Sequence, residues 1–230
     1  MTKIFCDIAD INLIKKFNKK KIVKGFTTNP SLIRKAGAKN YSEYCKKILK
    51  ITKKTISFEV FADDSKSIIK QANIIKDWGR NVYVKVPVTN SKGLFLGNVI
   101  KELNKKNIKL NITAVYTADQ TSKILKKINR KSKIIISIFA GRMADKGKDP
   151  IPEFKKSIKL AKKYKNVEIL WASVREPYNY LQAKKLKTHI ITVPPSIIEK
   201  IESFGKSFLD LTTDTVKGFL IDSKKSKFKI

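Results

Sequence analysis

Hydrophobic and polar residues follow two alternating patterns along the chain. Short runs rich in β-branched residues are separated by longer stretches in which apolar residues recur every three or four positions. The short runs are Lys3–Asp7, Ile22–Thr27, Thr55–Phe61, Val82–Pro87, Lys109–Thr113, Lys133–Phe139, Val167–Ala172 and His189–Val193. Helical spacing is clearest over Ser65–Trp78, Lys92–Asn104 and Ala118–Asn129. This alternation predicts repeated βα units and therefore a parallel sheet.

The number of strand–helix units predicts how the sheet closes. Eight units in this length favour a single (β/α)8 TIM barrel. A doubly wound open sheet is the alternative, but the Gly-rich dinucleotide turn of such sheets does not follow the first strand. Pro30, Pro152 and Pro177 stand where helices are expected to begin. Since no linker-like segment interrupts the pattern, we expect one catalytic domain over residues 1–230, with a C-terminal helix and basic tail from about residue 207.

Composition excludes wholesale disorder, and the net charge calls for an explanation. The chain is 42% hydrophobic and 9% aromatic, which is enough to build a core. Its formal net charge is +32, yet only five of the 51 basic residues are Arg, and the Lys residues are spread along the whole chain. We interpret them as a solvated surface and expect no specific nucleic-acid partner. A basic barrel that binds polyanions is retained as an alternative.

The sequence argues against membrane insertion, a disulfide framework, a metal centre and a bound cofactor. No apolar run approaches the roughly 20 residues of a membrane helix, and no apolar leader begins the chain, so we expect a cytoplasmic protein without membrane contact. Two cysteines and one histidine do not suggest a disulfide framework or a metal centre. No cofactor-binding fingerprint is present, and we expect neither a cofactor nor a metal.

Polar residues cluster at the predicted carboxyl ends of the strands, where TIM barrels place their chemistry. Such side chains are costly to bury, so their presence there indicates function. In chain order, the polar residues at these strand ends are Asp7, Thr27, Thr28, Asn29, Glu59, Lys85, Asn111, Thr113, Ser137, Arg142, Ser173 and Arg175, and the aromatic Phe139 lies among them.

Three cations in this set are the most informative. Lys85 lies between Val84 and Val86 in a predicted strand. Burial favours the neutral amine, which is a nucleophile toward carbonyl groups. Arg142 and Arg175, two of only five arginines, follow adjacent predicted strands, and a guanidinium matches the geometry of a phosphate. An outward-facing lysine and ordinary surface arginines are the alternatives.

The same segments resemble the transaldolase family, including its small members that act as fructose-6-phosphate aldolases. The matching motifs, in order along the chain, are Asp7 followed by Ala9, Gly25–Leu32, Val84–Thr89, Asn111–Thr113, Phe139–Arg142 and Ala172–Arg175. The resemblance implies a (β/α)8 barrel that transfers a three-carbon dihydroxyacetone unit from a ketose phosphate to an aldose phosphate. It places the protein in carbohydrate metabolism, with the pentose phosphate pathway as the central setting of the family.

The resemblance also implies residue roles. Lys85 would form the Schiff base, Asp7 would act as acid and base, and Glu59 and Thr113 would hold the reacting water. The substrate-binding set would be Thr28, Asn29, Asn111, Ser137 and Phe139, together with Arg142, Ser173 and Arg175 at the phosphate. The expected partners are sugar-phosphate substrates and further copies of the chain, because small members of the family form homo-oligomers through C-terminal helices.

Two positions distinguish the branches of the family. The resemblance associates Glu59 and Phe139 with transaldolases, where the aldolases carry Gln and Tyr. We therefore favour the transferase, with an aldolase that releases free dihydroxyacetone as the alternative. Ile8, Ile138 and Ala140 depart from the family's usual Thr, Pro and Val. These departures leave the catalytic atoms intact and the choice of sugars and pathway open.

Overall fold

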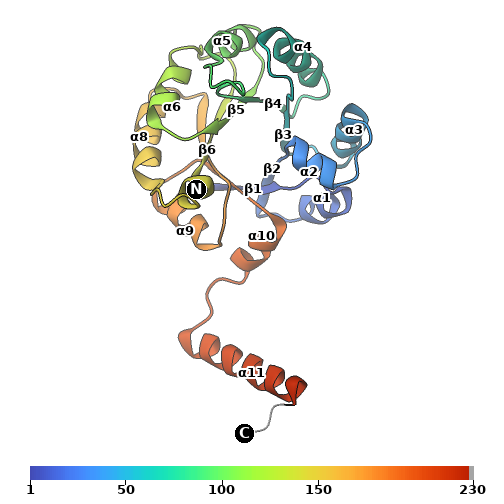
Figure 1. Ribbon diagram of the computed structural model, residues 1–230, viewed down its shortest axis with the longest axis vertical. Coiled ribbons are helices and arrows are strands. Elements are labelled where there is room, and N and C mark those ends of the chain that lie inside the picture. Colours follow the sequence, from blue (N-terminus) through green and yellow to red (C-terminus); the bar gives the residue numbers. More distant parts are fainter. Residues whose placement is uncertain (228–230) are drawn as a thin grey trace.

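Eight parallel strands form a closed barrel in the computed structural model, which describes residues 1–227 (Figure 1). The strands are β1 (Lys3–Asp7), β2 (Val23–Thr27), β3 (Thr55–Glu59), β4 (Val82–Pro87), β5 (Leu110–Val115), β6 (Ile134–Phe139), β7 (Val167–Ala172) and β8 (Ile190–Val193). Each strand pairs with the next in sequence, and β1 closes the ring against β8. The predicted TIM barrel is confirmed, and the doubly wound sheet is excluded.

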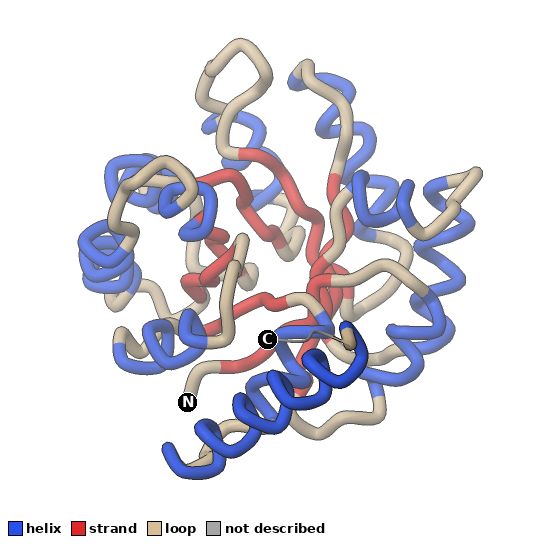
Figure 2. The backbone as a smooth tube through the Cα atoms, turned by 60° about the horizontal axis from the view of Figure 1, so that its bottom comes forward, coloured by secondary structure: helices blue, strands red, loops and turns tan. Residues whose placement is uncertain are grey.

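Most of the helices connect successive strands and surround the barrel (Figures 1 and 2). They are α1 (Ile11–Asn18), α2 (Pro30–Lys35), α3 (Tyr41–Ile51), α4 (Ser65–Lys76), α5 (Gly97–Lys105), α6 (Ala118–Leu125), α7 (Ala140–Ala144), α8 (Ile151–Ala161), α9 (Tyr178–Lys185), α10 (Pro195–Glu202) and α11 (Phe208–Ser226). Local chemistry sets several of their starts. Asn29 caps α2 by accepting a hydrogen bond from the Leu32 N–H, and Pro30 fills the first helical position.

Several predicted elements are shorter than expected, among them the helix predicted over Ala118–Asn129, which ends at Leu125. Side chains account for two of the differences. The helix expected from Lys92 begins only at Gly97, because Asn90 Oδ1 accepts from the N–H groups of Lys92 and Leu94 and holds a turn. The third strand ends at Glu59, before the expected Phe61. There the Phe61 N–H donates a hydrogen bond to Gln71 Oε1 at 2.9 Å, so it is not available to pair with the neighbouring strand.

The barrel interior changes from apolar to polar along the strands. Phe5, Tyr83, Ile135, Leu170 and Ile190 form a buried apolar cluster inside the barrel. Strand side chains repeat every two residues, so the next inward positions on four of these strands are Asp7, Lys85, Ser137 and Thr192. The apolar cluster is therefore the floor beneath a polar layer at the carboxyl ends of the strands. A larger core fills the space between the strands and the helices.

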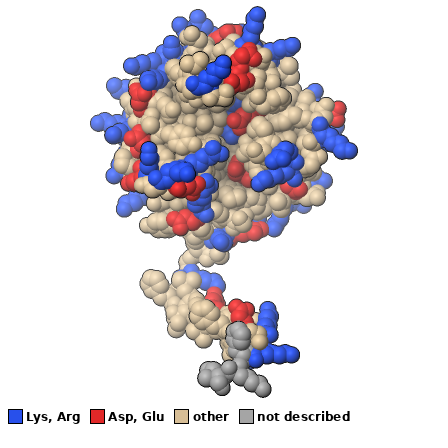
Figure 3. All heavy atoms as spheres, in the orientation of Figure 1, with Lys and Arg blue, Asp and Glu red and all other residues tan. Residues whose placement is uncertain are grey.

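Much of the positive charge lies at helix ends. Each of α1–α6 and α8–α10 has Lys or Arg in its last turn, where a cation offsets the negative end of the helix dipole. Apart from the short α2, which lies beside the pocket, these helices run opposite to the strands, so their C-termini lie at the other end of the barrel from the polar layer. Figure 3 shows Lys and Arg around the periphery, with Asp and Glu between them. This arrangement fits the interpretation of the lysines as a solvated surface.

The last described helix, α11, projects away from the barrel (Figure 1). Ser207 caps it through a capping box with Asp210, and it contains no buried residue. The helix occupies most of the segment predicted from residue 207. The end of the predicted basic tail, residues 228–230, lies outside the described residues. Over residues 1–227, no helix combines the length and apolar character needed to cross a bilayer.

Candidate active site

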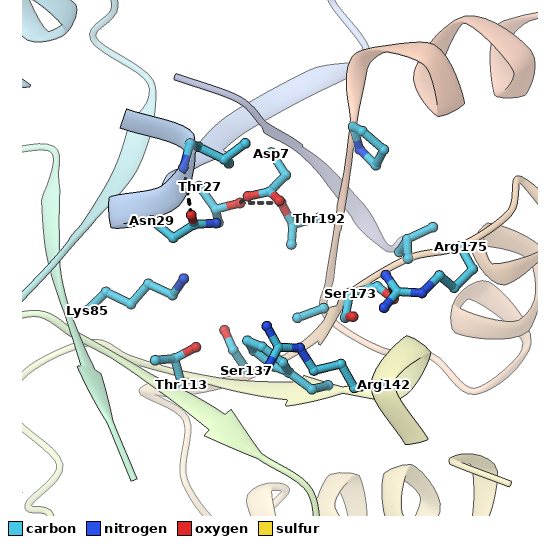
Figure 4. A pocket seen from close by; sticks show the side chains of 15 residues that line it. Asp7, Thr27, Asn29, Lys85, Thr113, Ser137, Arg142, Ser173, Arg175 and Thr192 are labelled. Atoms are coloured by element: carbon cyan, nitrogen blue, oxygen red, sulfur yellow. Dashed lines mark hydrogen bonds between the residues drawn. The ribbon is translucent and has the colours of Figure 1, made fainter. Parts of the chain in front are cut away.

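The polar layer opens into a pocket of about 320 Å³ at the carboxyl ends of the strands (Figure 4). Its lining comes from β1, β2, β4, β5, β6, β7 and β8 and from the loops that follow them. The lining residues are Asp7, Thr27, Asn29, Leu32, Lys85, Thr113, Ser137, Phe139, Arg142, Ala172, Ser173, Val174, Arg175, Thr192 and Pro194. Residues from both ends of the sequence thus meet in one cavity.

Lys85 is buried and paired. Its side chain points into the pocket in Figure 4, and the residue is only 7% exposed. The Nζ atom lies 3.0 Å from Glu59 Oε2 and donates to the Thr28 carbonyl oxygen at 3.1 Å. Glu59 and Lys85 occupy paired positions of β3 and β4, so the barrel itself holds them together. The Lys85 nitrogen therefore meets one carboxylate and one carbonyl oxygen inside the barrel.

Asp7 heads a chain of hydroxyl groups. Thr27 Oγ1 donates to Asp7 Oδ1 at 2.6 Å and lies 2.5 Å from Thr192 Oγ1 (Figure 4). The Thr27 hydroxyl has one proton, so when it donates to Asp7 the Thr192 hydroxyl donates to Thr27. Burial raises the pKa of Asp7 above its usual value, while Lys85 and the Thr27 hydrogen bond oppose the shift. The carboxyl group is therefore suited to both hold and release a proton.

A second buried network supports the opposite wall. The Asn111 side chain accepts from Ser137 Oγ at 2.6 Å and donates to Ser57 Oγ at 3.0 Å. Asn111 is fully buried and does not line the pocket, so it orients Ser137, which does. Thr113 Oγ1 is buried and makes no hydrogen bond with any described residue. Its hydroxyl remains able to bond a molecule in the pocket.

Two arginines lie at the far side of the pocket, and each is held by a different neighbour. The Arg142 guanidinium carbon is 5.3 Å from the centre of the Phe139 ring. Arg175 donates from Nε and Nη2 to Asp145, a residue outside the pocket lining. This ion pair lowers the pKa of Asp145 and raises that of Arg175. Two guanidinium groups therefore reach one cavity with their orientations already set.

The predicted site residues lie together: most line the pocket, and the others contact these lining residues from behind. Most of them line the pocket itself: Asp7, Asn29, Lys85, Thr113, Ser137, Phe139, Arg142, Ser173 and Arg175. Glu59 and Asn111 act from behind this lining, through Lys85 and Ser137. Thr28 contributes its carbonyl oxygen to Lys85, while its hydroxyl donates to the Ser57 carbonyl oxygen at 2.8 Å.

Sequence reasoning assigned no role to three residues that the geometry singles out. Thr192 is the next-to-last residue of β8. Thr27 was predicted only as part of a strand end. The polar side chain of Thr192 in the eighth predicted strand is visible in the sequence, whereas no sequence signal pairs Asp145 with Arg175. Among residues 1–227, no group of His, Cys, Asp or Glu side chains is arranged to hold a metal ion.

The fold and pocket define a (β/α)8 barrel whose lysine-centred pocket lies at the carboxyl ends of the strands. The chain matches the Transaldolase/Fructose-6-phosphate aldolase family over residues 4–230 and belongs to it. A probable transaldolase of Thermoanaerobacter sp. (strain X514) is 34% identical over 229 residues, which cover 99% of this chain and all of that protein. A probable transaldolase of Nitrosopumilus maritimus (strain SCM1) is 34% identical over 227 residues, 98% of this chain and 96% of that protein.

Solved structures with little sequence similarity share the fold. The 4-hydroxy-tetrahydrodipicolinate synthase of Methylacidiphilum fumariolicum SolV superposes with a TM-score of 0.60 at 10% identity. The match covers 86% of this chain and 69% of that one. At this identity the likeness concerns the barrel alone.

Proposed function

We propose that the protein is a Schiff-base transaldolase that moves a dihydroxyacetone unit from a ketose phosphate to an aldose phosphate. The observation that carries the proposal is the buried Lys85, 3.0 Å from Glu59, in one pocket with Asp7 and two arginines. Family membership limits the choice to a transferase or an aldolase. The residues then supply a nucleophile, two proton-transfer groups and an anion site.

Lys85 is the nucleophile. Its neutral Nζ attacks the ketone carbon of the donor, and loss of water from the carbinolamine gives an iminium ion. The attack requires an unprotonated amine, and Glu59 lies at hydrogen-bonding distance to accept the ammonium proton. Glu59 and the unpartnered Thr113 hydroxyl hold the water that leaves in this step and returns for hydrolysis.

Asp7 breaks and makes the carbon–carbon bond. Its carboxylate takes the proton of the donor hydroxyl next to the bond that breaks. The bonding electrons move into the iminium, which becomes an enamine on Lys85, and an aldose phosphate leaves. The enamine carbon then attacks the aldehyde of a second aldose phosphate, and Asp7 returns the proton to the new hydroxyl. The Asn29 amide donates a hydrogen bond to a substrate hydroxyl, and Ser137 Oγ, whose own proton goes to Asn111, accepts one.

Arg142, Ser173 and Arg175 bind the phosphate group. The two guanidinium groups and the Ser173 side chain line the same side of the pocket, away from Lys85 (Figure 4). A sugar phosphate can therefore place its carbonyl carbon near Lys85 and its phosphate at the arginines. Phe139 shapes the wall between them and supports Arg142.

Glu59 favours transfer over release of free dihydroxyacetone. A carboxylate can exchange a proton with the reacting water, whereas the amide found in the aldolase branch cannot. Product analysis with and without an aldose-phosphate acceptor separates the two reactions. Transfer predicts turnover that requires the acceptor, and acceptor-independent release of dihydroxyacetone would contradict it.

The Schiff base can be tested by borohydride reduction. Incubation with fructose 6-phosphate and borohydride should leave a three-carbon adduct on Lys85, located by peptide mass mapping. The Lys85→Arg variant should carry no adduct, whereas Lys109→Arg, altered at a surface lysine, should be labelled like the wild type. An unmodified Lys85 in the folded wild-type protein would contradict the mechanism.

We further propose a cytoplasmic homo-oligomer assembled through α11. One side of this helix carries Phe208, Leu211, Val216, Phe219 and Leu220, all exposed in the single chain. A surface this apolar is typical of an interface, and a second copy of the chain is the occupant we propose. Sedimentation analysis of the full chain should give a multimer, and Phe219→Lys should shift it toward the monomer. The two buried free cysteines suit a reducing compartment.

A further inference from the structure

Asp145 and Arg175 form a bidentate ion pair beside the pocket. Arg175 Nε donates to Asp145 Oδ1 at 3.0 Å, and Nη2 donates to Oδ2 at 2.5 Å. The two parallel bonds place the carboxylate against one edge of the planar guanidinium. The pair joins the end of α7, which follows β6, to the loop after β7.

The pair determines which part of Arg175 can meet a ligand. A guanidinium has five N–H groups, and the edge formed by Nε and Nη2 is occupied by Asp145. The end formed by Nη1 and Nη2 remains, with Nη1 3.4 Å from the Ser173 carbonyl oxygen. Arg175 lines the pocket and Asp145 does not. The carboxylate therefore backs the guanidinium from outside and leaves its end free to face the cavity.

The backbone holds Asp145 in place for this contact. Asp145 follows directly after α7, and its N–H donates to the Gly141 carbonyl oxygen at 2.8 Å. Gly141 packs so closely on the next loop that an added Cβ would lie 1.7 Å from the Ser173 carbonyl oxygen. Ser173 itself adopts a left-handed conformation, with φ of 63°. Gly141 and Ser173 thus fix the position of Asp145 relative to the loop that carries Arg175.

We infer that Asp145 is a positioning residue, which turns Arg175 so that the Nη1–Nη2 end of its guanidinium binds the substrate phosphate. The inference rests on the proposed function, in which Arg142 and Arg175 bind that phosphate. Preorganisation lowers the cost of ordering a long side chain when the ligand arrives. Arg142 receives the equivalent support from the Phe139 ring, so both guanidinium groups are oriented before substrate binds.

The position of Asp145 argues against a blocking role. A carboxylate that competed with phosphate would occupy the pocket-facing end of the guanidinium. Asp145 instead takes the edge formed by Nε and Nη2 and lies outside the lining. Its negative charge still lowers the net charge beside the phosphate. Asp145 therefore orients the Arg175 guanidinium but weakens the electrostatic attraction of the site for phosphate. If removing the Asp145 charge weakens phosphate binding, the residue has a positioning role; if removal strengthens binding, it has a blocking role.

The test removes the charge of Asp145 and compares it with a matched change in the same segment. Asp145→Asn keeps the size of the side chain, and Asp145→Glu keeps the carboxylate. Asp149→Asn is the control, because it removes one charge four residues away and keeps the oxygen that accepts from the Ile151 N–H. Calorimetry measures the binding of inorganic phosphate to each variant. Kinetics compare fructose 6-phosphate with its unphosphorylated analogue, fructose, as donor.

Asp145→Asn should weaken phosphate binding and raise KM for the phosphorylated donor by roughly tenfold, as expected for loss of a group that orients a ligand-binding side chain. The value of kcat and the turnover of fructose should stay near wild type, and Asp145→Glu should recover part of the loss. Phosphate binding by Asp145→Asn that is as tight as in Asp149→Asn, or tighter, would overturn the inference. An equal loss of kcat/KM with fructose 6-phosphate and with fructose would also overturn it, because that result indicates a merely structural role for Asp145. Failure of the proposed function is separate, since it appears as the absence of an adduct on Lys85.

Discussion

The Lys85 ammonium and the Glu59 carboxylate lie 3.0 Å apart at paired positions of two neighbouring strands, largely shielded from solvent. The strand register fixes this pair, so the carboxylate accompanies the lysine without any contribution from a loop. Buried charges persist when they are paired and hydrogen-bonded, and the Thr28 carbonyl oxygen accepts a further bond from Nζ. The proposed nucleophile therefore has a proton acceptor built into the barrel wall.

Replacing Glu59 by Gln should slow the reaction strongly. The amide retains the shape of the side chain but cannot accept the Lys85 proton or activate water. Loss of a general acid–base group typically lowers kcat by about 10²–10⁴-fold. Single-turnover trapping with borohydride should show slower formation of the Lys85 adduct. Glu102→Gln, which breaks an exposed pair with Lys106, should leave the rate unchanged. A Glu59→Gln enzyme with wild-type kcat would exclude this role for the carboxylate.

Replacing Thr27 by Val should change the pH dependence of the reaction. The Thr27 hydroxyl lowers the pKa of Asp7, so its removal should raise that pKa further. Because the carboxylate form of Asp7 is the proposed base, the acidic limb of the kcat/KM profile should move to higher pH. A hydrogen bond to a charged group is worth enough to shift the limb by about one pH unit.

The matched control for Thr27→Val is Thr121→Val, which removes a buried hydroxyl that contacts Ser157 Oγ outside the pocket. Its acidic limb should coincide with that of the wild type. An acidic limb of Thr27→Val that does not move would show that the hydroxyl chain leaves the working pKa of Asp7 unaffected.

The strands could be predicted well because buried parallel strands are apolar on both faces. Val82–Pro87 and Val167–Ala172 have the predicted bounds. Errors occur where a distant or local side chain takes a backbone N–H. Gln71 ends the third strand in this way, and Asn90 delays the start of α5. Such contacts depend on the folded positions of both groups and leave no periodic signal.

The sequence allowed the site residues to be predicted from their places at the ends of strands, but it did not allow the hydrogen bonds between them to be predicted. Parallel closure alone brings Asp7 and Lys85 to the same end of the barrel. Side-chain direction is set by packing, and the Thr28 hydroxyl accordingly bonds the Ser57 carbonyl oxygen. The contact between Thr27 and Thr192 joins residues 165 positions apart, and only closure of β8 on β1 makes it.

Replacing Asp7 by Asn should abolish turnover and stabilise the fold at neutral pH. Burial raises the pKa of Asp7 in the folded protein above the unfolded value of about 3.9. Between these two values the folded state binds more protons, so its stability falls as pH rises through the folded pKa. Asn removes the buried charge and still accepts the Thr27 hydrogen bond.

Thermal unfolding at several pH values checks this prediction. The variant should have the higher Tm at pH 7, with about 2–4 °C for each kcal/mol gained in a protein of this size. The difference should narrow as the pH falls and Asp7 of the wild type becomes protonated. Asp119→Asn, at an exposed helix position, should show no such pH-dependent difference. A lower Tm for Asp7→Asn at pH 7 would contradict the prediction.

Replacing Tyr41 by Phe should destabilise the backbone of Glu59 at the end of β3. The Tyr41 hydroxyl donates to the Glu59 carbonyl oxygen at 2.8 Å and accepts from the Glu59 N–H at 3.0 Å. Its loss leaves two part-buried backbone groups unpaired, so the free energy of unfolding should fall by about 1–3 kcal/mol. The value of kcat should fall as well, because the end of β3 is no longer held.

Urea unfolding and steady-state kinetics measure the two effects of Tyr41→Phe. Tyr44→Phe is the control from the same helix, since the Tyr44 hydroxyl donates to the Ala9 carbonyl oxygen and not to β3. It should lose comparable stability and keep the wild-type kcat. Equal kcat values for the two variants would show that Tyr41 supports only the fold.

Replacing Gly141 by Ala should separate the two loops that carry the arginines. A Cβ at this position would lie 1.7 Å from the Ser173 carbonyl oxygen, a backbone atom that cannot move aside as a side chain could. The contact would force α7 away from the loop after β7. Arg142 and Arg175 would then no longer converge on one phosphate.

Gly141→Ala should therefore bind inorganic phosphate more weakly than the wild type in calorimetry and should unfold at a lower temperature. Gly218→Ala is the matched control, because nothing lies within 4 Å of its added Cβ and α11 stays helical there. That change should stabilise the helix by up to about 1 kcal/mol and leave phosphate binding intact. Circular dichroism confirms that both variants fold before binding is compared. Wild-type phosphate affinity in folded Gly141→Ala would show that the close contact between α7 and Ser173 does not set the distance between the arginines.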